Sequence, residues 1–177
     1  MKIIMPLDVT DAMLTASNIL EDDAPLWNGA TAYTRGQQII STTTHRIYRA
    51  LRDHAGVDPD LEALAFDDPL VDDPTPRAWQ ILSPTNKWQP FDQKPSVVAQ
   101  NPEVIVYEIA PGDFVAGLAL FNVSAQEIRI TGTTPDEQQV YSATTNMTNV
   151  DAIADWYDYY FAELTFNDTA QFSDLPP

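Results

Sequence analysis

The sequence predicts a mainly β protein, in which a small three-stranded module precedes an antiparallel β-sandwich with one short helix near the C-terminus. From residue 97 onward, short runs rich in β-branched and aromatic residues alternate with turn residues. The run Glu127–Thr131 alternates strictly between apolar and polar residues, which indicates a strand with one buried face. Of the 177 residues, 44% are hydrophobic and 20% charged, a composition typical of chains that fold. A chain of this length can form one hydrophobic core and a small second one.

Three regions follow one another along the chain. Residues 1–24 are predicted to form an extended arm, because Pro6 interrupts the first apolar run and the later apolar residues lack helical spacing. Residues 25–82 form the small β module. Inside it, residues 58–76 are predicted to be a stiff loop, since prolines fix φ and adjacent aspartates repel one another. Residues 83–177 form the sandwich domain.

Five runs are the predicted sandwich strands. Phe114–Val123 is apolar on both faces, so we expect it to be a central strand. The helix is predicted after Asn149 or Asp151, either of which is a suitable N-cap. The five strands are Val97–Val98, Val104–Ile109, Phe114–Val123, Glu127–Thr131 and Gln139–Ser142. The apolar side of the helix consists of Ile153, Trp156, Tyr157, Tyr160 and Leu164, spaced for one helical face.

The chain is strongly acidic, with 26 acidic and 9 basic side chains and a net charge of −17. Such a charge argues against binding of nucleic acid, whose phosphates require Lys and Arg, and against anionic membrane surfaces. Membrane insertion is not expected, because no apolar run reaches the roughly 18 residues of a spanning helix. The N-terminus also lacks the basic head and apolar stretch of a targeting signal.

The charge is distributed unevenly. Residues 1–102 carry a net charge of −6, whereas residues 103–177 carry −11, with Arg129 as their single basic residue. Within residues 33–54 four arginines face one acidic residue, Asp53. Two interpretations remain open: the arginines pair with the neighbouring Asp-rich segment, or they form a docking patch for an acidic neighbour such as a second copy. The four are Arg35, Arg46, Arg49 and Arg52.

The sequence shows no recognisable catalytic motif, so we expect no enzyme, no cofactor and no metal site. Without cysteine there are no disulfides, thiolate metal ligands or thiol nucleophiles. The two histidines, His45 and His54, are not part of a metal or nucleophile motif. Two interpretations of the adjacent aspartates stay open: a solvated acidic loop, or part of a Ca²⁺ site. The pairs are Asp22-Asp23, Asp67-Asp68 and Asp72-Asp73. A carboxylate-based hydrolase of polysaccharide stays a further alternative, because such an enzyme depends on the distance between two carboxylates.

Residues 25–54 resemble the small carbohydrate-binding modules of the chitin-binding family 5/12. Trp27 comes early, Tyr33-Thr34-Arg35-Gly36 follows, and then a strand leads to Tyr48. In that family, exposed aromatic side chains stack on sugar rings. The resemblance therefore implies Trp27, Tyr33 and Tyr48 as candidate glycan-stacking residues.

A broader resemblance covers nearly the whole chain and is to structural proteins of tailed-bacteriophage virions. Pro6–Asn18 is similar to the N-terminal arm of phage tail-tip and fibre-region proteins. In those proteins, as in this chain, a module that contains tryptophan and tyrosine follows the arm. The block Ser83–Asp92, with the sequence SPTNKWQPFD, is the most specific match. The segment Asp155–Phe161 and the closing Leu-Pro-Pro match in the same order.

This resemblance implies a structural component of the tail-tip or baseplate region, located in the virion and assembled in the cytoplasm of a bacterial host. The implied partners are other virion tail proteins, with copies of the chain arranged in a symmetric ring. The alternative function is a glycan-binding adhesion module that contacts polysaccharide on the host surface. The candidate assembly residues are Ile3, Ile4, Leu14, Arg35, Arg46, Arg49, Arg52, Trp88, Phe91, Trp156, Tyr157 and Tyr160.

Overall fold

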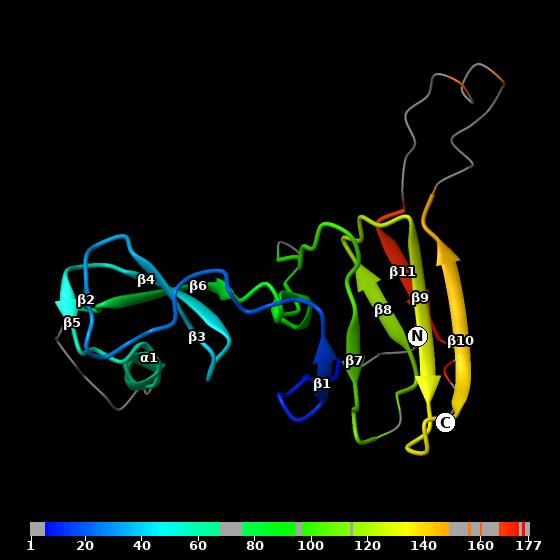
Figure 1. The fold of residues 1–177 in the computed structure, drawn as a ribbon, viewed down its shortest axis with the longest axis horizontal. Helices are drawn as coiled ribbons and strands as arrows, with labels where there is room; N and C mark the ends of the chain where they lie inside the picture. Colours follow the sequence, from blue (N-terminus) through cyan, green and yellow to red (C-terminus); the bar gives the residue numbers. More distant parts are fainter. Residues whose placement is uncertain are drawn as a thin grey trace. The chain divides into compact units, whose positions relative to one another are not determined.

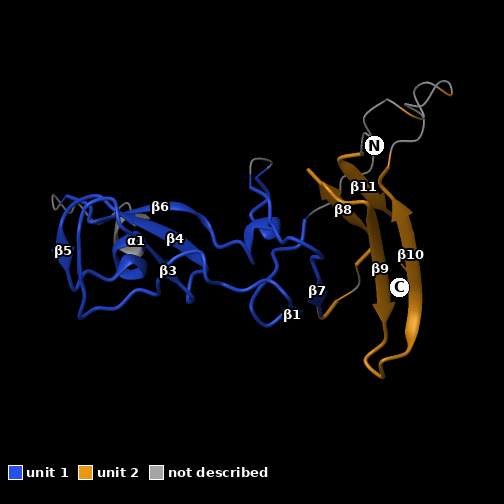
Figure 2. Cartoon of the chain, turned by 45° about the horizontal axis from the view of Figure 1, so that its top comes forward, with its two compact units in different colours: residues 1–110 blue, residues 111–177 orange. Residues whose placement is uncertain are grey.

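The computed structural model confirms a mainly β protein built from small antiparallel sheets (Figure 1). The chain divides into two compact units, residues 1–110 and residues 111–177 (Figure 2). The structure describes residues 6–67, 76–94, 97–113, 115–148, 156, 160, 167–173 and 175. No helix among these residues is long and apolar enough to cross a membrane.

The module in the first unit contains the predicted three-stranded sheet. The strands β3 (Gln38–Ser41), β4 (Arg46–Ala50) and β6 (Trp79–Pro84) are antiparallel, in the order β3-β4-β6. A second pair, β2 (Ala32–Tyr33) with β5 (His54–Ala55), completes the module. β3 and β4 pair in register, and this places Ile39 opposite Tyr48 on the buried face.

Half of the buried residues in the core of the module are aromatic. The indole of Trp79 meets the rings of Tyr33 and His54 edge to face, with centroids 5.1 and 4.5 Å apart. Trp27 and Val57 pack against the periphery of this core. Edge-to-face contacts between large rings contribute stability beyond the burial of their area. The buried members are Tyr33, Ile39, Tyr48, Ala50, Ala78 and Trp79.

The prediction of a stiff loop over residues 58–76 is wrong for its first half, which forms helix α1 (Pro59–Asp67). The carboxylate of Asp58 accepts hydrogen bonds from the backbone amides of Asp60 and Leu61, at 2.9 and 3.3 Å. Asp58 is therefore the N-cap, and Pro59 occupies the first helical position, where its missing amide costs nothing. Residues 68–75 lie outside the described residues.

The predicted boundary between residues 82 and 83 is also not where the chain divides. Strand β6 runs through it to Pro84, and the first unit continues to residue 110. In this unit β1 (Leu14–Ser17) of the arm pairs antiparallel with β7 (Tyr107–Ile109), so the last part of the run Val104–Ile109 belongs to the first unit. Val97 and Val98 are not part of a strand.

The second unit contains two antiparallel pairs. In the first pair, β9 (Glu127–Thr133) and β10 (Gln139–Asn146) form a hairpin, and exposure alternates along β9 as its sequence predicts. In the second pair, β8 (Leu118–Phe121) lies beside β11 (Thr169–Phe172). Among the described residues β8 has one neighbouring strand, so its predicted central position is not observed there.

The predicted C-terminal helix falls almost entirely outside the described residues. Trp156 and Tyr160 are described, and both have helical backbone. Their ring centroids are 6.5 Å apart, as expected for positions i and i+4 of a helix.

Candidate functional site at the His45 junction

His45 connects the N-terminal arm to the module. It ends the turn between β3 and β4 with a φ of 54°, a left-handed conformation that is uncommon outside glycine. Its Nδ1 lies 2.8 Å from Glu21 Oε1, and its Nε2 lies 2.6 Å from Asp11 Oδ1. Both ring nitrogens of His45 therefore face carboxyl groups of the arm.

Trp88 supports the imidazole from one side. The two rings are stacked, with centroids 4.3 Å apart and an interplanar angle of 23°. Phe91 packs against Trp88 edge to face, and Tyr107 packs in the same way against Phe91. Burial raises the pKa of Tyr107 to about 12, and its hydroxyl donates a hydrogen bond to the carbonyl oxygen of Lys87. A continuous row of rings thus links His45 to β7.

The block Ser83–Asp92 is the centre of this junction. Thr85 is fully buried, its amide donates to the carbonyl oxygen of His45, and its hydroxyl donates to Glu21 Oε1. The amide of Asn86 donates to both carboxylate oxygens of Asp23, and its side chain makes two hydrogen bonds of 2.7 Å with the backbone of Gln100. The block therefore fastens the arm, the β3–β4 turn and the segment before β7 to one another.

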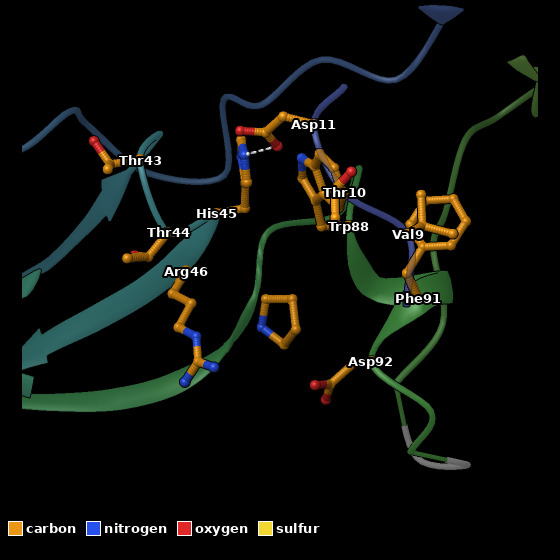
Figure 3. A pocket seen from close by; sticks show the side chains of 11 residues that line it. Val9, Thr10, Asp11, Thr43, Thr44, His45, Arg46, Trp88, Phe91 and Asp92 are labelled. Carbon is orange, nitrogen blue, oxygen red and sulfur yellow. Dashed lines mark hydrogen bonds and ion pairs between the residues drawn. The ribbon is translucent and has the colours of Figure 1, made fainter. Parts of the chain in front are cut away.

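A pocket of about 330 Å³ opens beside the junction (Figure 3). Three segments line it: the arm, the β3–β4 turn, and the short 3₁₀ turn Gln89–Phe91 with its neighbours. The indole Nε1 of Trp88 is buried and has no hydrogen-bond partner among the described residues. The lining residues are Val9, Thr10, Asp11, Thr43, Thr44, His45, Arg46, Pro84, Trp88, Phe91 and Asp92.

The junction is suited to holding segments together. Among the described residues, no three His, Asp or Glu side chains form a group that could hold a metal ion. Its one imidazole has both nitrogens in contact with carboxylates, which it uses to fix the arm. Of the aspartates considered for Ca²⁺, Asp23 is used to bind a backbone amide, while Asp68, Asp72 and Asp73 lie outside the described residues.

Two of the three residues proposed to stack on sugar are in the core, so their assignment as stacking residues is wrong. Tyr33 is 6% exposed and Tyr48 1% exposed, and protein atoms cover both rings. Burial raises the pKa of Tyr48 to about 12, and its hydroxyl donates to Asp60 Oδ1. Trp27 is half-buried against the core, with no hydrogen-bond partner for its Nε1 among the described residues.

The four arginines of residues 33–54 do not form one cluster. Arg46 lies at the start of β4 and lines the pocket, whereas Arg49 lies near the other end of the strand. The backbone amide of Arg35 binds Asp53, and Arg52 Nε donates to the carbonyl oxygen of Pro76. None of the four guanidinium groups lies within salt-bridge distance of a carboxylate in the described part of the chain.

The remaining candidate assembly residues have different environments. Trp88 is buried in the junction, and Phe91 and Leu14 are half-buried. Trp156 and Tyr160 are 74% and 70% exposed. Ile3, Ile4 and Tyr157 lie outside the described residues.

Sequence reasoning missed the residues that build the junction, namely Asp11, Glu21, His45, Thr85 and Asn86. Asp11, Glu21, His45 and Thr85 bind one another across 24 to 64 residues of sequence, and Asn86 binds Asp23 and Gln100. No local pattern encodes such contacts. The available signal was the block Ser83–Asp92, which the resemblance singles out and which contains Thr85 and Asn86.

Comparison with known proteins identifies no relative of this chain. No protein-family model, no curated protein and no solved structure matches this chain.

Proposed function

We propose that this chain is a structural subunit of a tailed-bacteriophage virion, in the tail-tip or baseplate region, that assembles with other virion proteins. The resemblance of its arm, module and SPTNKWQPFD block to such proteins supports the proposal. The hydrogen bonds of the block offer a physical reason for its composition, since Thr85 and Asn86 each fasten two other segments.

The observation that carries the proposal is an exposed apolar strip before β7. Val104, Ile105 and Val106 are 56%, 43% and 49% exposed. Asn18 occupies one edge of this segment: its side chain binds the carbonyl oxygen of Val104 and the amide of Val106. The backbone groups of Ile105 have no hydrogen-bond partner among the described residues.

Such a strip is suited to protein contacts. An extended segment with one free edge can accept a strand from a partner. Covering the apolar side chains beside it would remove them from water, which is favourable. The described sheets are small, most of them with two strands, and a two-stranded sheet is marginally stable alone in water. Contacts with neighbouring subunits would supply the burial that these sheets lack.

Quantitative mass spectrometry of purified particles from a phage that encodes the chain tests the proposal. We expect several copies per particle, located at the tail by immunogold labelling. The substitution Ile105→Asp should strongly reduce incorporation, whereas Val98→Asp, at another exposed valine outside the strip, should not. Complete, infectious particles that lack the chain would overturn the proposal.

A further inference from the structure

Asn28 and Gly29 begin a surface turn of the module. Asn28 is the single asparagine of the sequence that is followed by glycine, and both residues are exposed. The carbonyl oxygen of Asn28 accepts a hydrogen bond of 3.0 Å from the amide of Thr31, which closes the turn before β2. Because glycine has no Cβ, the backbone nitrogen of Gly29 is unhindered on the side of the preceding side chain.

The carboxamide of Asn28 is held through its oxygen alone. Its Oδ1 accepts a hydrogen bond of 2.9 Å from the backbone amide of Ala30, which forms an Asx turn. In the described part of the chain, Asn28 Nδ2 and the amide of Gly29 make no hydrogen bond. Asn86 is a contrasting case, because both its carboxamide oxygen and its nitrogen bind the backbone of Gln100 and lysine follows it.

This geometry favours attack of the Gly29 nitrogen on the side chain of Asn28. The hydrogen bond between Oδ1 and the amide of Ala30 spans Gly29, so the carboxamide stays beside the attacking nitrogen. Attack on Cγ places negative charge on Oδ1. The amide of Ala30 already donates to this oxygen, at a distance suited to stabilise such a charge.

We propose that Asn28 is a site of spontaneous deamidation in the folded chain. The Gly29 nitrogen bonds to Cγ of Asn28, the bond between Cγ and Nδ2 breaks, and ammonia leaves with the proton of the Gly29 amide. Water then opens the cyclic imide at one of its two carbonyl carbons. The product has aspartate or isoaspartate in place of Asn28, and either one adds a negative charge to the surface of the module.

The two products differ in their effect on the turn. Aspartate keeps a carboxyl oxygen at the position of Oδ1, so the Asx turn is retained. Isoaspartate adds a methylene carbon to the main chain before Gly29. The former main-chain oxygen of Asn28, which accepts from Thr31 and from the hydroxyl of the core residue Tyr33, then belongs to a carboxylate outside the main chain. The conversion thus couples the age of the chain to the strength of this turn.

Peptide mapping by mass spectrometry of the purified full chain, aged at mildly alkaline pH, tests the proposal. The converted fraction at Asn28 should rise steadily with time. It should exceed the converted fraction at Asn86 by roughly tenfold or more, because lysine hinders the attack that glycine permits. Hydroxylamine, which cleaves cyclic imides, should cut the folded chain after Asn28.

Gly29→Ala is the matched variant. Gly29 does not have a positive φ, so alanine can adopt its backbone, and the new Cβ would lie 3.3 Å from the indole ring of Trp27. The variant should have the circular dichroism spectrum of the wild type and deamidate several-fold more slowly. An aged wild-type chain in which Asn28 is unchanged, or converts no faster than Asn86, would overturn the proposal. Equal rates in the wild type and in folded Gly29→Ala would also overturn it.

Thermal unfolding tests the effect of the conversion. Freshly prepared Asn28→Asp should have the thermal midpoint of the unaged wild type, because it keeps the Asx turn. The aged, converted chain should unfold at a lower temperature, since part of it contains isoaspartate. Identical midpoints for the aged chain and Asn28→Asp would overturn the proposed loosening of the turn.

Discussion

Tyr48 donates a hydrogen bond of 2.8 Å to Asp60 Oδ1, and so connects the centre of strand β4 to the first turn of helix α1. Thr44 donates to the same oxygen at 2.7 Å, and Ser41 donates to the other carboxylate oxygen at 2.5 Å. The carboxylate of Asp60 is thus shared by three hydroxyl groups of the β3–β4 hairpin. The helix is fastened to the sheet at this point.

This arrangement predicts a loss of stability in alkali. Burial raises the pKa of both Tyr48 and Tyr107 to about 12, from an ordinary value of 10.0. Below pH 10 both hydroxyls are protonated in the folded and unfolded chains. Between pH 10 and 12 only the unfolded chain releases these protons, so the free energy of unfolding falls as the pH rises. Urea unfolding at several pH values measures the slope, which Tyr48→Phe should reduce.

Tyr48→Phe should also cost about 1.5–3 kcal/mol at neutral pH, because a buried hydrogen bond to a charged acceptor is lost. The ring itself stays in place, so the fold is retained. Thr34→Ala, at an exposed position outside this network, is the control and should leave the free energy of unfolding nearly unchanged. If the free energy of unfolding of Tyr48→Phe falls between pH 10 and 12 as steeply as that of the wild type, the assignment of the titration to this residue is contradicted.

Asp58→Ala should destabilise the module by about 0.5–2 kcal/mol, the usual cost of removing a helix N-cap. The side chain of Asp58 accepts the amides of Asp60 and Leu61, and alanine would leave both without this partner. Asp22→Ala is a matched control, because Asp22 is exposed and makes no hydrogen bond among the described residues. Chemical denaturation of the two variants gives the comparison. Equal effects would mean that charge, and not capping, explains the result.

Sequence patterns predicted the features of this fold that depend on residues close to one another in the sequence. The alternation of Glu127–Thr131 predicted β9, because one face of a strand is buried and the other is wet. Helix α1 was missed because Asp58-Pro59 also begins turns and loops, and its apolar side is weak, with Leu61 66% exposed. The same two residues form an N-cap followed by proline at the first helical position, and this signal was present in the sequence.

The candidate site could not be predicted because its contacts are long-range. His45 was visible as an isolated histidine, but its carboxylate partners lie 24 and 34 residues away. Tyr33 and Tyr48 were interpreted as exposed aromatics because the resemblance covers the order of residues, not their burial. In the structure the alternation of β4 turns Tyr48 to the same side as Ala50, into the core.

Glu21→Gln should loosen the arm more than Asp11→Asn. The side chain of Glu21 is 13% exposed and accepts hydrogen bonds from both His45 and Thr85, whereas that of Asp11 is 66% exposed and binds His45 alone. An interaction of a buried charged group is worth about 1.5–3 kcal/mol, and an exposed pair about 0–1 kcal/mol. Hydrogen exchange of residues 10–19 measures the loosening. Similar protection in the two variants would contradict the dominant role of Glu21.

The module should lose stability as the pH falls through about 6.5, the pKa of histidine in the unfolded chain. Burial, and secondarily the charge of Arg52, lower the pKa of His54, against smaller opposing effects of Glu62 and Asp53. Neither ring nitrogen of His54 has a hydrogen-bond partner among the described residues. Below about pH 6.5 the unfolded chain therefore binds a proton at His54 that the folded chain binds only at lower pH. Acid consequently favours unfolding. In His54→Phe the thermal midpoint should depend less on pH between 7 and 5, values that bracket this titration.

Gly117→Ala should destabilise the second unit and leave the first unit unchanged. A Cβ at position 117 would lie 2.8 Å from the backbone oxygen of Phe172, and backbone cannot move aside as a flexible side chain can. The pairing of β8 with β11 would have to shift, at a cost of about 1–3 kcal/mol, typical of overpacking. Ser124→Ala, on the exposed loop after β8, is the control. Hydrogen exchange should increase in β8 and β11 while β3, β4 and β6 keep their protection. Increased exchange throughout both units would contradict the prediction, because it would mean that the two units unfold together.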